Sequence, residues 1–225
     1  MGGGILPVAI KNNEIYFLFG KENELDDTPG WADFGGGKEE GETALETATR
    51  EGSEEINGFL GSAEKLRKIV KKNKVVTLKF KEYTTYIFNM EYDDKLPYYY
   101  KNNYDFFSRY LPHVKHKKDN GLLEKAKIRW FSYDELKKEK KGFRSFYQNI
   151  VDLIIKQEKI IRDKLIKKGD IIFDVGVNVG FFSVYAANKI SNTGKIYSIE
   201  ASPIMVKRFE NVLHESKFDT ISIYN

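Results

Sequence analysis

Alternating apolar and polar positions near the N-terminus predict two β-strands, LPVAIK and EIYFLFG, within residues 5–20. Asn12 and Asn13 lie between them, and asparagine accepts the left-handed conformations of tight turns, so we expect a hairpin. The same pattern predicts a short strand over residues 30–34, two strands or one long bent strand over 74–92, and a strand over 127–132.

Apolar residues recur at helical spacing in three further stretches. One helix is expected to start near Thr43, capped by Glu42 and Thr43, with Ala44, Leu45, Ala48 and Ile56 on its buried side. A second is expected from Tyr133 to Lys140, with Asp134 near its cap, and a third over residues 142–168. Residues 96–120 show no clean period, so a long functional loop or an inserted helix is expected there. Together these elements predict an α/β fold with a mixed sheet between helices.

The pattern changes at residue 169. Strand, glycine-rich turn, helix, strand, helix and strand follow one another to residue 225, which predicts a partial Rossmann-like βαβ unit. The expected organisation is a first domain over 1–148, a linking helix over 149–168, and this unit over 169–225. Because a complete domain of this kind needs several more strands, we expect the last segment to be an incomplete one.

Composition limits the classes of protein to consider. The chain has 225 residues, of which 41% are hydrophobic and 14% aromatic, so it can bury a core. It has no cysteine, which excludes disulfides, thiolate zinc sites and cysteine nucleophiles. No apolar run approaches the ~20 residues that cross a bilayer, and no secretory signal is visible, so we expect a soluble cytoplasmic protein without a membrane partner.

The candidate chemistry lies in residues 36–59, GGKEEGETALETATREGSEEINGF. Glu51, Glu54 and Glu55 stand at i, i+3 and i+4, so their carboxylates are expected to gather on one patch of a helix. Such an oxygen cluster suits Mg²⁺ or Mn²⁺. Arg50 lies two turns beyond Glu42 and can pair with it. The alternative is a glutamate-rich helix that is merely solvated.

This stretch resembles the box of the Nudix hydrolase family. Gly36, Glu42, Arg50, Glu51, Glu54 and Glu55 fill the family's pattern in register. Three positions depart from it: Gly52 replaces a bulky aliphatic residue, Asn57 replaces the closing glycine, and Gly58 replaces an apolar residue. Asn57 still suits a left-handed helix end, whereas Gly52 is expected to remove a core contact and soften the helix.

The resemblance implies an α/β/α sandwich that hydrolyses a diphosphate linked to a further group. It implies that Glu51, Glu54 and Glu55 hold the metal ions, with help from the Gly35 carbonyl. Gly36, Glu42 and Arg50 would support the site. Glu51 or Glu124 would accept the proton of the attacking water; the alternative for Glu124 is a surface glutamate paired with Lys125 or Lys127.

Residues 169–180, GDIIFDVGVNVG, resemble the S-adenosylmethionine-binding start of FkbM-type class I methyltransferases. Asp174, Gly176, Asn178 and Gly180 carry the likeness, and Glu200 stands where an acidic residue would bind ribose hydroxyls. The resemblance implies S-adenosylmethionine as a cofactor. The alternative is a folded remnant that only packs on its neighbour.

The substrate is expected to be a polyanion, because lysines and arginines crowd residues 65–81 and 115–118, unless these are ordinary solvated surface. The first domain also resembles Nudix proteins of large DNA viruses, which implies host cytoplasm as its location. Capped RNA is the expected substrate, cleaved to methylated GDP, with stacking surfaces offered by Trp31, Tyr98, Tyr99, Tyr100, Tyr104 and Phe106. The alternatives are an inositol pyrophosphate (diphosphoinositol polyphosphate) substrate, an RNA-binding module with an inactive Nudix fold, and a methyltransferase with a Nudix appendage. The oligomeric state stays open.

Overall fold

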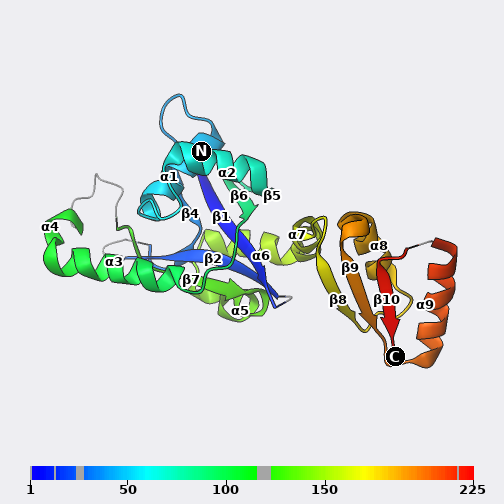
Figure 1. Ribbon diagram of the computed structural model, residues 1–225. Helices are drawn as coiled ribbons and strands as arrows, with labels where there is room; N and C mark the ends of the chain where they lie inside the picture. The colour runs from blue at the N-terminus through cyan, green and yellow to red at the C-terminus, as the bar shows by residue number, and fades with distance from the viewer. Residues whose placement is uncertain (1, 13, 24–27, 116–122, 217) are drawn as a thin grey trace. The chain divides into compact units, whose positions relative to one another are not determined.

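A computed structural model describes residues 2–12, 14–23, 28–115, 123–216 and 218–225. The chain divides into two compact units, 1–161 and 162–225. Unit 1 contains a mixed sheet with strand order β3-β2-β1-β6-β5, in which β4 also pairs with β1 and β7 with β2 (Figure 1). Among the described strands of this sheet, β1 and β6 pair in parallel and the other pairs are antiparallel. The strands are β1 (Gly2–Lys11), β2 (Glu14–Glu22), β3 (Trp31–Ala32), β4 (Phe34–Gly37), β5 (Lys74–Phe80), β6 (Tyr83–Asn89) and β7 (Lys125–Ser132).

The two faces of this sheet carry different cores, because neighbouring residues of a strand point to opposite sides. Leu18 and Trp130 belong to the core under α1 (Ala44–Glu55), α2 (Ala63–Asn73) and α3 (Leu96–Tyr110). Phe19 and Phe131 face the other side, where their rings meet Phe143 at 4.9 and 5.3 Å between centroids. There α5 (Tyr133–Glu139) and α6 (Tyr147–Lys156) cover the sheet. The unit is therefore the expected α/β/α sandwich.

The hairpin, the paired strands within 74–92 and the box helix are confirmed. Asn12 takes a φ of 48° in the first hairpin, and Lys81 takes 51° in the turn between β5 and β6. Residues 96–120 contain the inserted α3 and the short α4 (Pro112–Lys115), and residues 116–120 lie outside the described residues.

Three parts of the fold differ from what the sequence predicts. Asp33 divides the expected strand at 30–34 into β3 and β4, because its carboxylate is bonded to β6. Ser132 caps α5 by accepting from the Glu135 N–H, and Asp134 lies in the first turn near this cap, as expected. The expected helix over 142–168 is a 3₁₀ turn η2 (Lys140–Gly142), α6 and α7 (Glu158–Leu165), with Gln157 at φ −101°, ψ 10° between the last two. Finally α2 was not expected, because lysines fill its solvent side and only Leu66 and Val70 are buried.

Unit 2 contains β8 (Ile171–Val175), α8 (Phe181–Ile190), η3 (Ser191–Thr193), β9 (Lys195–Ile199), α9 (Pro203–Ser216) and β10 (Ile221–Tyr224). Its strands are parallel in the order β10-β9-β8, as the βαβ pattern predicts. Gly180 has a φ of +81°, and a Cβ there would lie 1.9 Å from the Phe209 ring, so the turn requires glycine. Ile171, Phe173 and Val175 of β8 are exposed.

Candidate active site

The box helix α1 begins where the sequence predicts and lies close to β1. Thr43 caps it, and Thr43 and Glu46 form a reciprocal capping box. Gly52 faces Ile5 of β1: a Cβ at Gly52 would lie 2.5 Å from the Ile5 side chain. The expectation that Gly52 removes a core contact is therefore wrong, because Ile5 fills the space that a larger residue at 52 would take.

Arg50 gathers the carboxylates on the exposed side of α1. Its Nε lies 2.8 Å from Glu42, and its Nη2 donates to the Gly37 carbonyl at 3.1 Å. Its Nη1 lies 3.0 Å from Glu51 and 3.2 Å from Glu54. Hydrogen bonding from Arg50 lowers the pKa of Glu42 to about 2, and the same bond raises the pKa of Arg50. Arg50 thus holds the loop before α1 and the two glutamates together.

Glu51 rests against Gly36 of β4, in space that a side chain at position 36 would share. A Cβ at Gly36 would lie 2.5 Å from the Glu51 carboxyl carbon. Burial raises the pKa of Glu51, although Arg50 opposes the rise. The carboxylate is therefore both confined and a better proton acceptor than a free glutamate.

Glu55 points away from this pair and into the unit. One oxygen accepts the Gly35 N–H at 2.7 Å, and the other lies 2.9 Å from the Lys125 ammonium. Lys125 also pairs with Glu22, and Glu22 pairs with Arg144 Nη1 at 2.7 Å. Burial raises the pKa of Glu55. Burial also lowers the pKa of Lys125, but the carboxylates of Glu55 and Glu22 outweigh that effect, so the pKa of Lys125 is raised. The expected single patch of three carboxylates is thus divided into two sites.

Sequence reasoning missed Lys125 and Glu22 as members of the site. Strand alternation could not have found Lys125, because it puts residues 125 and 128 on opposite faces. A register shift, which pairs Lys125 with Glu22 and Ile128 with Gly20, brings both side chains inside. Glu22 is the cross-strand partner of Lys125 in β2, which only the register of β2 and β7 reveals.

Glu124 lies beside Lys125, next to a backbone held by two asparagines. The Leu123 N–H donates to Asn57 Oδ1 at 3.0 Å, and Asn23 Nδ2 donates to the Leu123 carbonyl at 3.0 Å. Asn57 has a φ of 52° at the end of α1, as expected of a residue replacing the closing glycine. The proximity of Glu124 raises the pKa of both Glu51 and Glu55, although other causes are larger.

The donor set at Glu51 and Glu54 fits a hard divalent cation. Both carboxylates already converge on one cationic atom, Arg50 Nη1, and Gly36 leaves the space that Glu51 occupies. In the described part of the chain, no three His, Cys, Asp or Glu side chains are grouped to hold a metal ion. Glu55 is paired with Lys125 instead of joining the other two.

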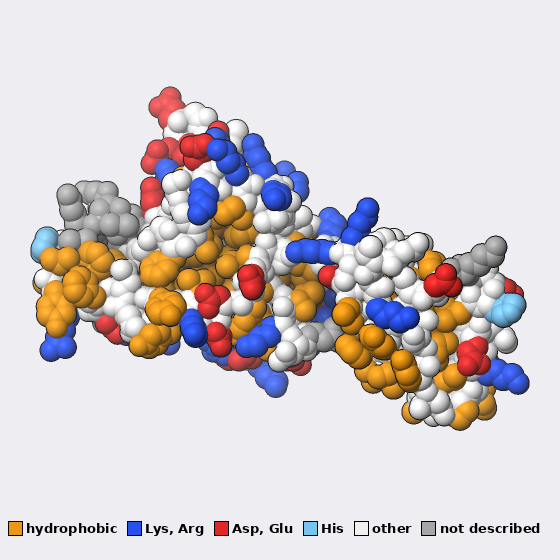
Figure 2. Space-filling model, viewed as in Figure 1, with side chains coloured by type: hydrophobic (Ala, Val, Ile, Leu, Met, Phe, Trp, Pro, Cys, Tyr) orange, Lys and Arg blue, Asp and Glu red, His pale blue; other side chains and the backbone are white. Residues whose placement is uncertain are grey.

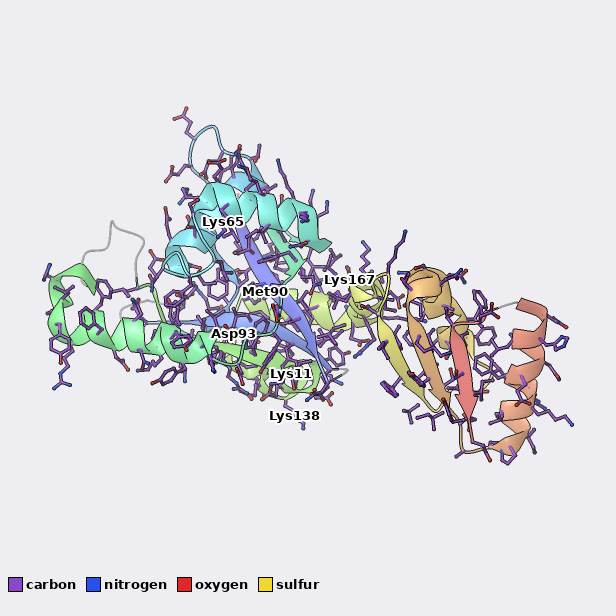
Figure 3. All side chains as sticks on the ribbon, viewed as in Figure 1. Lys11, Lys65, Met90, Asp93, Lys138 and Lys167 are labelled. Atoms are coloured by element: carbon purple, nitrogen blue, oxygen red, sulfur yellow. The ribbon has the colours of Figure 1, made fainter. Side chains whose placement is uncertain are left out.

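The candidate substrate-binding residues are only partly at the surface. Trp31, Tyr100 and Tyr104 are buried, and Tyr100 donates to the Glu55 and Lys125 carbonyls at 2.8 and 3.1 Å. Their expected stacking role is corrected, because Tyr100 and Tyr104 lie where α3 packs on β7, and the Trp31 ring packs against Phe131 at 4.9 Å between centroids. Tyr98, Tyr99 and Phe106 remain exposed. Lysines crowd the exposed side of α2, where Lys65 is labelled in Figure 3 and blue side chains gather in Figure 2.

In unit 2 the residues of the methyltransferase-like turn lie together. The Glu200 carboxylate accepts the backbone N–H groups of Asn178 at 2.7 Å and Ser202 at 2.9 Å, which lowers the pKa of Glu200. Asp174 accepts from the Ser183 hydroxyl at 2.6 Å, and Gly176 has a φ of +79°. Binding of S-adenosylmethionine by these residues stays a prediction.

No helix in the described residues is both long and apolar enough to span a lipid bilayer. A search of curated proteins gave no match.

Solved structures resemble parts of the chain. A C. elegans Ap4A hydrolase binary complex is 15% identical, with 72% of this chain and 98% of that chain covered and a TM-score of 0.43. A Francisella tularensis bifunctional NMN adenylyltransferase/ADP-ribose pyrophosphatase, complexed with AMP and a Mn ion, is 16% identical, with 69% and 41% covered and a TM-score of 0.43. A SAM-dependent methyltransferase from Aquifex aeolicus is 20% identical, with 42% and 47% covered and a TM-score of 0.28. This chain thus spans less than half of that methyltransferase.

The NUDIX domain family model matches residues 5–152, which contain the whole sheet from Ile5 onward, the box helix and Lys125. The chain therefore belongs to the Nudix domain family.

Proposed function

We propose that unit 1 hydrolyses a diphosphate bond with a divalent cation held by Glu51 and Glu54. The observation that carries this proposal is the convergence of both carboxylates on Arg50 Nη1, at 3.0 and 3.2 Å. The box pattern adds Glu55 and the Gly35 carbonyl as further predicted ligands. Mg²⁺ or Mn²⁺ bound there would neutralise diphosphate oxygens and lower the pKa of a water molecule.

The roles of the chain's own residues follow from their contacts. Arg50 orients Glu51 and Glu54 and ties them to the loop through Glu42. Glu51 is the first candidate to accept a proton from the attacking water, because burial raises its pKa. Glu124 is the second candidate, because it follows the backbone that Asn57 anchors.

For the substrate we propose capped RNA, cleaved to release methylated GDP. The exposed lysines of α2, among them Lys65, Lys68, Lys71 and Lys72, offer a basic surface for a polyanion. Tyr98, Tyr99 and Phe106 offer exposed rings on which a base can stack.

A diphosphoinositol polyphosphate is the second candidate substrate. The burial of Trp31, Tyr100 and Tyr104 favours it, because half of the expected stacking rings are withdrawn while the lysines stay exposed. A polyphosphorylated inositol needs cations and no stacking surface.

Incubation of the full chain with cap-labelled RNA and with a diphosphoinositol, each with Mg²⁺ and with Mn²⁺, separates these candidates. Release of labelled methylated GDP, lost in Glu54→Gln, is the expected result. The double variant Tyr98→Ala, Tyr99→Ala is expected to raise KM for capped RNA and leave that for the diphosphoinositol unchanged. Turnover of the inositol alone would reverse the order.

RNA binding without turnover of either compound would favour the inactive RNA-binding module. For unit 2, titration of the full chain with S-adenosylmethionine, with Asp174→Ala as control, tests the methyltransferase resemblance. A lack of binding would leave only a packing role for that unit.

A further inference from the structure

The box pattern predicts that Glu55 binds a metal ion, but in the structure Glu55 faces the buried ammonium of Lys125. Lys125 is completely buried, and its Nζ lies 2.9 Å from Glu55 Oε1. The same Nζ contacts Glu22 in a closer ion pair. Both carboxylate side chains are nearly inaccessible to solvent, at 4% and 2% exposure.

Both oxygens of Glu55 already have partners within the chain. Oε1 has the ammonium, and Oε2 accepts the Gly35 N–H at 2.7 Å. Because Gly35 belongs to β4, this bond ties the end of α1 to the strand that carries Gly36, against which Glu51 rests.

The charges of this buried group balance without a metal ion. Glu22 and Glu55 carry two negative charges, and Lys125 and Arg144 carry two positive ones. Buried carboxylates are stable only when paired and hydrogen-bonded. A divalent cation at Glu55 would be repelled by the ammonium of Lys125 at short range. If the ammonium were removed, Glu22 would keep only its ion pair with Arg144 among the ion pairs of the described residues.

We propose that Lys125 is a built-in cation that replaces one divalent ion of the box, so that metal binds through Glu51 and Glu54 while Glu55 positions β4. This proposal rests on the proposed function. It makes Lys125 a positioning residue that sets how many metal ions the site takes.

Mn²⁺ titration of the full chain, followed by calorimetry and by the electron paramagnetic resonance of free Mn²⁺, tests this directly. Lys125→Met is expected to bind one more Mn²⁺ per chain than the wild type, because Glu22 and Glu55 lose their shared ammonium. Mn²⁺ is also expected to raise the Tm of Lys125→Met more than that of the wild type. Lys127→Met, an exposed lysine of the same strand, is the matched control and should behave as wild type.

A folded Lys125→Met that binds the same number of Mn²⁺ ions as the wild type would overturn the proposal and leave the proposed function intact. If Lys125→Met does not fold, Glu55→Gln in the otherwise native chain decides: an unchanged Mn²⁺ number supports the proposal, and a loss of one ion overturns it. A wild-type chain that binds no Mn²⁺ would instead overturn the proposed function and this proposal together.

Discussion

The Nε atom of Arg50 lies 2.8 Å from the carboxylate of Glu42, which joins the second turn of α1 to the loop that precedes the helix. The same guanidinium reaches the Gly37 carbonyl, so one side chain fixes the approach to the site from two sides. Because a guanidinium presents several donors in one plane, it can hold these partners and the two glutamates at the same time.

Arg50→Lys is therefore expected to lower kcat by on the order of 10²-fold, with little change in KM. A lysine ammonium cannot contact Glu42, Glu51 and Glu54 together, so the carboxylates lose their fixed positions. Steady-state kinetics at saturating Mn²⁺ measure this. Arg67→Lys is the control, because Arg67 pairs with Glu46 at the partly exposed start of the helix. A kcat within twofold of the wild type would contradict the role given to Arg50.

Glu42 is expected to make stability fall in acid. Its pKa is lowered from 4.5 to about 2, chiefly by the hydrogen bond from Arg50. The carboxylate therefore stabilises the fold fully above pH 4.5, and this contribution is lost as the pH falls towards 2. Urea unfolding of the wild type and Glu42→Gln should show a difference that is constant near neutral pH and shrinks in acid. The exposed Glu40→Gln should show no such change, and a pH-independent difference for Glu42→Gln would contradict the prediction.

Asp33 is expected to act in the opposite direction. It is buried and accepts from Tyr83 at 2.9 Å and Thr85 at 2.8 Å, yet burial raises its pKa from 3.8 to about 6. The folded state thus binds a proton more tightly, so this residue increases stability as the pH falls from 6 to 3.8, by about 3 kcal/mol at roughly 1.4 kcal/mol per pKa unit. Asp33→Asn should lose that rise in urea unfolding across this range. An identical pH dependence in both proteins would refute the assignment.

Gly52→Ala is expected to destabilise unit 1 although alanine is the better helix former. The new Cβ would lie 2.5 Å from Ile5, and overpacking costs about 1–3 kcal/mol against a helix gain of about 1 kcal/mol. Denaturant unfolding should show a smaller cost in an Ile5→Ala background. Gly37→Ala is the control, since a Cβ there meets nothing within 4 Å. A more stable Gly52→Ala would show that Ile5 moves aside freely.

Tyr100→Phe is expected to cost roughly 1–3 kcal/mol of folding free energy, because the buried carbonyls of Glu55 and Lys125 lose their shared donor. Tyr98→Phe, at a side chain that is 64% exposed, should change stability little. Equal unfolding midpoints for the two variants would mean that another donor replaces the Tyr100 hydroxyl.

The sequence by itself determined the hairpin, the capped box helix and the positions of Arg50, Glu51 and Glu54 on it. These depend on contacts within one helical turn or one hairpin, and such contacts follow from spacing, turn residues and caps. The Asn57 helix end and the βαβ order of unit 2 could be predicted for the same reason.

Only the tertiary structure decided which cation each carboxylate meets. Glu54 and Glu55 are neighbours in sequence, yet one faces Arg50 and the other faces Lys125 of β7. Lys125 reaches Glu55 because β7 pairs with β2 in the register that sets Lys125 opposite Glu22. Strand register and the packing of α3 bring together residues that are far apart in the chain, and no local pattern records them. The same packing buries Tyr100 and leaves Tyr98 exposed, although both look alike in the sequence.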